Sequence, residues 1–74
     1  MNDEEPMEAQ KIFELIIKAD EKLKYAHEDN AGVRTRQARE LLEQARTAAV
    51  EIGNDALVTQ VDTRLADLPS DPST

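Results

Sequence analysis

The chain contains no cysteine and no tryptophan among its 74 residues, and only two glycines, three prolines and two aromatic side chains. The absence of cysteine excludes disulfides and cysteine-ligated zinc, and it favours a cytoplasmic location. Without disulfides or a structural metal, a domain this short needs well-packed helices or a partner chain. No segment shows the alternating β-branched and aromatic pattern of a strand. The sequence therefore predicts one all-α domain.

Basic residues are also scarce: nine Lys and Arg stand against sixteen Asp and Glu, which gives a net charge of −7. Nucleic acids and anionic membranes are bound through Lys and Arg, so we expect neither as a partner. No stretch approaches the roughly 18 apolar residues that span a bilayer. The acidic start, MNDEEPME, also lacks the features of a signal peptide. These observations predict a soluble cytoplasmic protein.

Helical periodicity predicts three helices between flexible ends. We expect an acidic N-terminal segment over 1–5, a single domain over 6–68 and a C-terminal tail over 69–74. The first helix is predicted to run from Pro6 to about His27. Its apolar positions spread over roughly 200° of the helix surface, with Leu15 on one flank and with Phe13 and Ile17 on the other. A helix at the surface of a small bundle usually shows a narrower apolar stripe.

The second and third helices each show a single narrow apolar face. The second is predicted to begin between Ala31 and Thr35 and to end at Gly53, a residue suited to a left-handed C-terminal position. Asn54 or Asp55 then caps the third helix, so the two form an antiparallel hairpin, with the first helix packed across both. The predicted core residues are Ala38, Leu41, Leu42, Ala45, Ala48, Ala49, Ile52, Leu57, Val58, Val61, Leu65 and Leu68.

Two segments of the chain resemble each other at an offset of about 42 residues, a spacing found in helical repeats. Residues 16–23 read IIKADEKL and residues 57–65 read LVTQVDTRL, and both place an apolar residue before Asp, at Asp20 and Asp62. Together with the alanine spacing between them, over about residues 16–65, this pattern resembles a tetratricopeptide repeat. The resemblance implies a helical hairpin with a capping helix that binds protein segments. That family has a small residue, usually glycine, where Asp20 and Asp62 stand here.

Catalytic or metal chemistry is not indicated. The single histidine, His27, has no further nitrogen or sulfur ligand near it in the sequence, and it fits the last turn of a helix better than a metal site. There is no cysteine nucleophile and no glycine-rich phosphate loop. Asp20 and Asp62 are the only carboxylates near apolar faces, and three small helices offer little pocket for acid–base work. We therefore expect no enzyme activity, no cofactor and no metal.

Four arginines, Arg34, Arg36, Arg39 and Arg46, lie on or just before the second helix. They could form a basic strip for an acidic partner. Alternatively, they could brace the helix itself, because Arg36 with Glu40, Arg39 with Glu43, and Glu43 with Arg46 all have the spacing of neighbours on a helix surface. The bracing interpretation is favoured, because every arginine within the helix has a carboxylate in reach.

The wide apolar arc of the first helix predicts a surface that meets another chain. The expected contact residues are Ile12, Phe13, Ile16, Ile17 and Leu23, with Tyr25 at the rim and with Arg39 and Arg46 as polar anchors. The predicted function is a small non-catalytic protein-interaction module, an adaptor or regulator, with a homodimer as the simplest form. Two alternatives remain: a homo-oligomeric assembly element without an outside partner, and a nucleic-acid-associated regulator that uses the arginines of the second helix.

Overall fold

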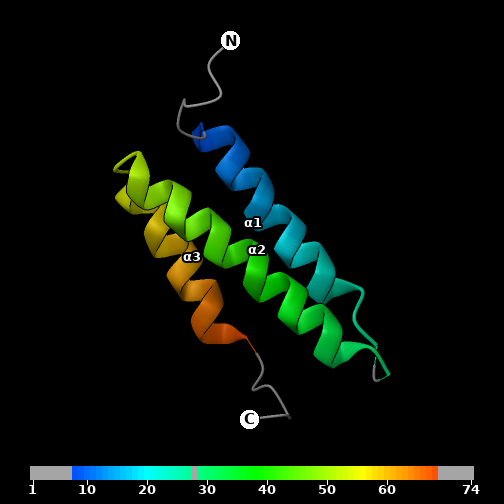
Figure 1. Ribbon diagram of the computed structural model, residues 1–74. Helices are drawn as coiled ribbons and strands as arrows, with labels where there is room; N and C mark the ends of the chain where they lie inside the picture. Colours follow the sequence, from blue (N-terminus) through cyan, green and yellow to red (C-terminus); the bar gives the residue numbers. More distant parts are fainter. Residues whose placement is uncertain (1–7, 28, 69–74) are drawn as a thin grey trace.

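The computed structural model describes residues 8–27 and 29–68, and this part of the chain is all-α (Figure 1). It forms three helices: α1 (Ala9–Lys24), α2 (Ala31–Glu51) and α3 (Asp55–Asp67). The predicted all-α three-helix fold is confirmed. The first helix begins at Ala9, after Glu8 as its N-cap, and not at Pro6 as expected. The predicted N-terminal segment and C-terminal tail lie outside the described residues.

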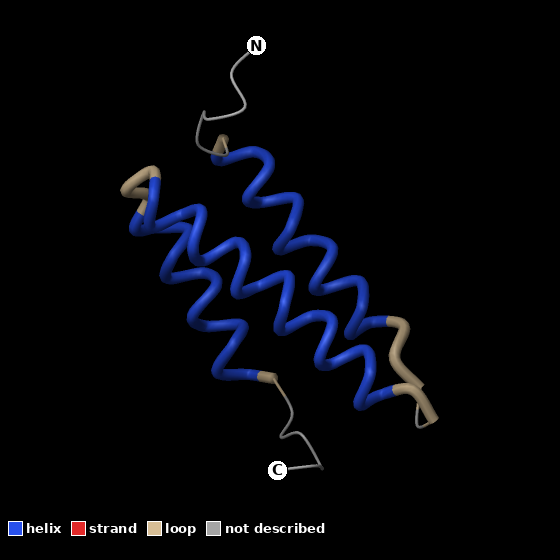
Figure 2. Tube along the Cα trace, in the orientation of Figure 1, coloured by secondary structure: helices blue, strands red, loops and turns tan. Residues whose placement is uncertain are grey.

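The longest helix, α2, lies between the other two and carries nearly all of the packing (Figures 1 and 2). It contacts α1 along most of its length and contacts α3 along its C-terminal half, and each neighbour runs antiparallel to it. In contrast, α1 and α3 meet over only a short stretch. The expected packing of the first helix across both of the others is therefore only partly correct, because α1 rests on α2 and barely reaches α3.

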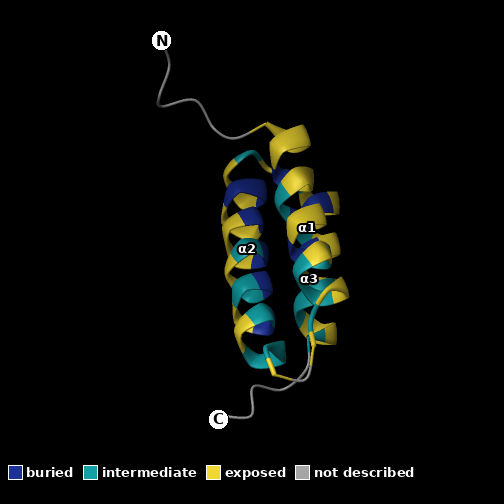
Figure 3. Ribbon diagram, turned by 90° about the vertical axis from the view of Figure 1, so that its right-hand side faces the viewer, coloured by how far each residue is buried: buried dark blue, intermediate teal, exposed yellow. Residues whose placement is uncertain are grey.

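The core is a thin layer between the inner faces of the three helices (Figure 3). Its large, fully buried side chains are Ile12, Ile16, Leu42 and Val61. On α2 they are accompanied by small residues, and Ala38, Ala45 and Ala49 are completely buried. Small side chains let two neighbouring backbones approach one helix closely. The predicted core is confirmed for α2 and α3, where Leu41, Ile52, Val58, Leu65 and Leu68 are half-buried and pack against its edge.

The turn between α2 and α3 is fixed by local hydrogen bonds. Gly53 adopts a φ of +69°, the left-handed conformation that the sequence predicted. The amide of Gly53 donates to Val50 O at 3.1 Å and the amide of Asn54 donates to Ala49 O at 2.9 Å, which together form a Schellman motif. Asn54 Oδ1 then accepts from the amide of Leu57 at 3.1 Å, so Asn54 is the N-cap of α3. A connection this short forces the two helices to be antiparallel neighbours.

The connection between α1 and α2 differs from the sequence prediction. Because α1 ends at Lys24, His27 lies in the turn and not in the last turn of the helix. Its amide donates to Asn30 Oδ1 at 2.6 Å, so the side chain of Asn30 closes the turn instead of capping α2. Thr35, the late end of the predicted range for the helix start, lies inside α2 and is buried. The helix therefore starts at the early end of the predicted range.

The two glycines provide a matched pair for testing the backbone conformations described for the two turns. Gly53→Ala is expected to lower the free energy of unfolding by about 1–2 kcal/mol, because a Cβ disfavours the left-handed conformation. Gly32 lies in the first turn of α2, has no positive φ, and has no atom within 4 Å of where a Cβ would stand. Gly32→Ala is therefore expected to raise the free energy of unfolding by roughly 0.4–1 kcal/mol. Urea unfolding followed by circular dichroism measures both, and a loss of stability in Gly32→Ala would contradict this reading.

Candidate functional site

The residues predicted to form one contact surface lie in separate environments. Ile12 and Ile16 are completely buried in the protein's own core, so they cannot contact a partner in the folded chain. This part of the prediction is wrong. The cause is the position of α2, which covers the centre of the apolar arc on α1. Leu15, on one flank of that arc, is half-buried and also packs against the core.

The other flank of α1 remains open. Phe13 is 45% exposed and Ile17 is 40% exposed, although both are large apolar side chains. Residues four apart are neighbours on a helix surface, so the two side chains lie side by side. We call these two residues the Phe13/Ile17 strip. Burial of apolar area contributes about 25 cal/mol per Å², so leaving the strip in water forgoes stabilisation that an additional chain could supply.

The strip stays open because α3 approaches α1 only farther along the helix. The link between the two is an ion pair in which Arg64 Nε donates to Asp20 Oδ1 at 3.2 Å. The same Nε lies 3.3 Å from Oδ2, and Arg64 Nη1 donates to Gln60 O at 3.4 Å. Asp20 thus has an ion-pair partner on α3.

Leu23 and Tyr25 do not extend the strip. Leu23 is half-buried against the core. Tyr25 follows the last residue of α1 and is 57% exposed. Its ring lies 5.7 Å from Lys24 Nζ, a distance at which the ammonium is attracted to the ring face. Tyr25 borders a crevice between α1 and α2, so it is not part of the rim of the strip.

The two arginines predicted to be polar anchors for a partner differ in their contacts within the chain. Arg46 Nε donates to Asp62 Oδ1 at 2.7 Å, which joins α2 to α3. This hydrogen bond, together with the negative charge of Asp62, raises the pKa of Arg46. The part of the stabilisation that depends on the charge of Arg46 is therefore lost only as the pH rises above the ordinary pKa of arginine. Arg39 is half-buried and forms no ion pair with another described residue.

The ion pairs of the described residues connect different helices. Arg46–Asp62 joins α2 to α3, and Arg64–Asp20 joins α3 to α1. The intrahelical pairs expected from spacing, such as Arg36 with Glu40, are not formed within this part of the chain. Both aspartates of the repeated sequence pattern, Asp20 and Asp62, thus accept a hydrogen bond from an arginine on a neighbouring helix.

A crevice that sequence reasoning did not find runs between α1 and α2. Its volume is about 390 Å³, and it is lined by Lys18, Glu21, Lys22, Tyr25, Arg34 and Leu41. A second hollow of about 250 Å³ shares Lys22 and Leu41 with it and adds Gln37, Glu40 and Gln44. The shared residues place the two hollows next to each other. The sequence does carry a signal, since Lys18, Lys22 and Tyr25 recur at helical spacing, but their neighbours on α2 are known only from the fold.

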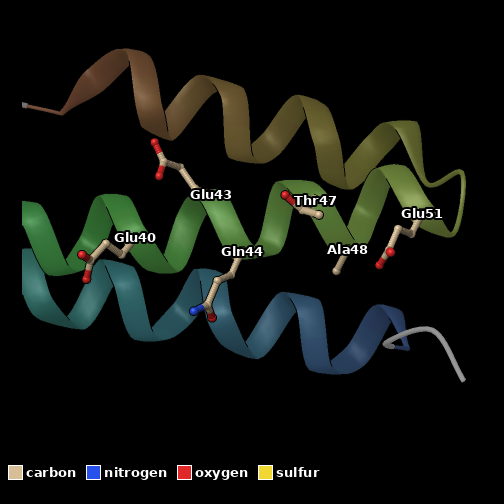
Figure 4. A pocket seen from close by; sticks show the side chains of 6 residues that line it. All are labelled: Glu40, Glu43, Gln44, Thr47, Ala48 and Glu51. Atoms are coloured by element: carbon tan, nitrogen blue, oxygen red, sulfur yellow. The ribbon is translucent and has the colours of Figure 1, made fainter. Parts of the chain in front are cut away.

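Another depression, of about 640 Å³, lies on the outer face of α2 (Figure 4). Its lining is Glu40, Glu43, Gln44, Thr47, Ala48 and Glu51. Figure 4 shows Glu43 directed towards α3 and Gln44 towards α1. All six residues belong to one helix, so no second element encloses a substrate or excludes water. The depression therefore lacks the arrangement that acid–base catalysis by carboxylates requires.

Over residues 8–27 and 29–68, no cluster of three or more His, Cys, Asp or Glu side chains could hold a metal ion. Within the same residues, none of the helices has the length and apolarity needed to cross a bilayer. No family model, no curated protein and no solved structure matches the chain. The resemblance to a tetratricopeptide repeat therefore stays a prediction from the sequence.

Proposed function

We propose that this protein is a small non-catalytic interaction module that docks an apolar helix of another chain on the Phe13/Ile17 strip. The observation that supports it is the exposure of these two large apolar side chains, 45% and 40%, side by side on one helix. Isolated exposed apolar residues are normal on protein surfaces. A pair on adjacent turns differs, because apolar residues at this spacing are the way one helix recognises another.

The occupant of the strip is either a helix of a different protein or α1 of a second copy, which would make the protein an adaptor or a homodimer. The experiment below distinguishes these two.

A photo-crosslinking amino acid at position 13 tests the proposal in the host cell. We expect a discrete adduct whose mass, read by mass spectrometry, identifies a second copy or a different chain. The same amino acid at position 50 is the control, because Val50 is 55% exposed but has no large exposed apolar neighbour one turn away. Identical adducts at both positions, or none at position 13, would refute docking on the strip.

The purified partner then provides a quantitative test. Phe13→Ser/Ile17→Ser is expected to weaken binding at least about tenfold, the factor for each 1.4 kcal/mol of lost contact energy. The matched control is Val33→Ser/Val50→Ser, which removes apolar side chains of similar exposure from separate places on α2. We expect it to bind like the wild type in calorimetry. Equal losses in the two double variants would show that the strip is not the docking surface.

A further inference from the structure

We propose that the crevice between α1 and α2 binds an acidic linear peptide of a partner protein, with an apolar side chain of that peptide placed over Leu41 and beside Tyr25. This inference goes beyond the interaction module proposed above. It concerns a different side of α1, and it does not depend on the Phe13/Ile17 strip.

The charge of the crevice is opposite to that of the chain. Its cations are Lys18, Lys22 and Arg34, and the lining of the two hollows together contains two carboxylates, Glu21 and Glu40. The chain as a whole has a net charge of −7. None of the three cations is in an ion pair with another residue of the described part. Hydrogen bonds from such cations to carboxylates are shorter and stronger than neutral ones, so this concentration of donors favours an acidic ligand.

The positions of the cations are defined by both helices. Lys22 from α1 and Arg34 from α2 are half-buried, so neighbouring residues cover part of each side chain, and both line the crevice. They stand on opposite walls. A peptide chain between them could therefore present carboxylates to both sides, and guanidinium groups can bind carboxylates with two parallel hydrogen bonds.

The crevice also offers apolar and neutral polar contacts. Leu41 is half-buried at the junction of the two hollows, and Tyr25 borders one end. These two residues provide a surface for one apolar side chain. The adjoining hollow adds Gln37 and Gln44, whose amides both donate and accept hydrogen bonds and so match the groups of an extended backbone. This combination distinguishes a peptide from a simple inorganic anion.

A peptide fits the shape better than a metabolite or a nucleic acid. Small-molecule sites usually bury 70–90% of the ligand, whereas this crevice lies at the surface between two helices and is elongated by the second hollow. A nucleic acid needs many cations spread over its phosphates, and a net charge of −7 opposes its approach. A short acidic segment, in contrast, needs only the local cations.

The test uses the full 74-residue chain and a fluorescein-labelled peptide made of Glu and Asp around a central Leu-Phe pair. We expect saturable binding by fluorescence anisotropy at low salt, weakened by salt. Amide shifts in nitrogen-15 NMR spectra are expected to cluster at the residues that line the crevice. Two further peptides, one with Lys for each acidic residue and one with Ser for Leu-Phe, are expected to bind more weakly.

Charge-reversal variants localise the site. Lys22→Glu/Arg34→Glu is expected to reduce affinity at least about tenfold. The control Lys11→Glu/Arg36→Glu makes the same change in net charge on the same helices, at exposed positions outside the crevice lining. It is expected to reduce affinity less than about threefold. Circular dichroism checks that the variants fold, and Lys22→Gln/Arg34→Gln replaces the reversal variant if that one does not.

Several results would overturn the inference. They are an absence of saturable binding, an equal loss of affinity in the control variant, equal binding of the serine peptide, and amide shifts centred on Phe13 and Ile17. The Phe13→Ser/Ile17→Ser variant is expected to bind the acidic peptide like the wild type. A failure of this inference therefore leaves the docking strip untouched, and a failure of the strip leaves the crevice untouched.

Discussion

Replacing Ile16 with Asp is expected to unfold the domain. Ile16 is completely buried between α1 and α2 among apolar side chains. A carboxylate placed there has no cation to pair with, and the desolvation of an unpaired charge costs several kcal/mol. Stability amounts to roughly 0.05–0.15 kcal/mol per residue, so about 60 ordered residues provide only about 3–9 kcal/mol. The cost of one buried charge is of the same size as the whole stability.

The same substitution at the next residue is the matched control. Ile17 is 40% exposed on the open flank of α1, so the carboxylate of an Asp at that position remains hydrated. Ile17→Asp is expected to retain the helical circular dichroism signal and a cooperative urea transition, while Ile16→Asp loses both. If both variants unfold, the strip belongs to the internal core and the proposed docking surface is wrong. If both fold, the burial described for α1 is wrong.

Leu42→Ala is expected to lower the free energy of unfolding by about 2–5 kcal/mol, the range for a leucine truncated in a packed core. Leu42 is one of the large side chains with no exposed surface, and it is the only one of these on α2. Its neighbours along the buried face are Ala38, Ala45 and Ala49. Alanines have no rotatable side chain that could move into the space, so the cavity left by the truncation stays open.

Leu41→Ala is the control for this second prediction. Leu41 is half-buried at the edge of the core and on the floor of the crevice, so it loses less apolar area and leaves no enclosed cavity. We expect a loss of about 1 kcal/mol from the area term alone. Urea unfolding monitored by circular dichroism gives both values. A larger loss for Leu41→Ala than for Leu42→Ala would show that the core does not lie where the structure places it.

The core of α2 and α3 could be read from the sequence because each helix carries one narrow apolar stripe. A narrow stripe has a single way to face the interior, as Leu42 and Val61 illustrate. The turn between these helices was equally readable. Gly53 and Asn54 act through their own backbone and side chain, and their hydrogen-bond partners lie within five residues in the sequence. Local chemistry of this kind does not depend on the rest of the fold.

The arc on α1 was ambiguous for the opposite reason. A stripe about 200° wide offers several orientations, and only the position of α2 decides that Ile16 is buried while Phe13 is exposed. The ion pairs between helices were also not predictable from the sequence. Helix spacing suggested partners for Arg46 on its own helix, but its partner is Asp62 on α3. The crevice is formed by side chains from two helices, so neither helix alone predicts it.

The limited contact between α1 and α3 has a consequence for how the domain opens. Detaching α3 breaks its contacts with α2, its few contacts with α1 and the Arg64–Asp20 ion pair, while the α1–α2 hairpin stays intact. Proteins open in such cooperative units, and the units with the fewest tertiary contacts open at the lowest free energy. Amide protons of α3 should therefore exchange with solvent before those of α2. Since α2 contacts both of the other helices, its amide protons should exchange last.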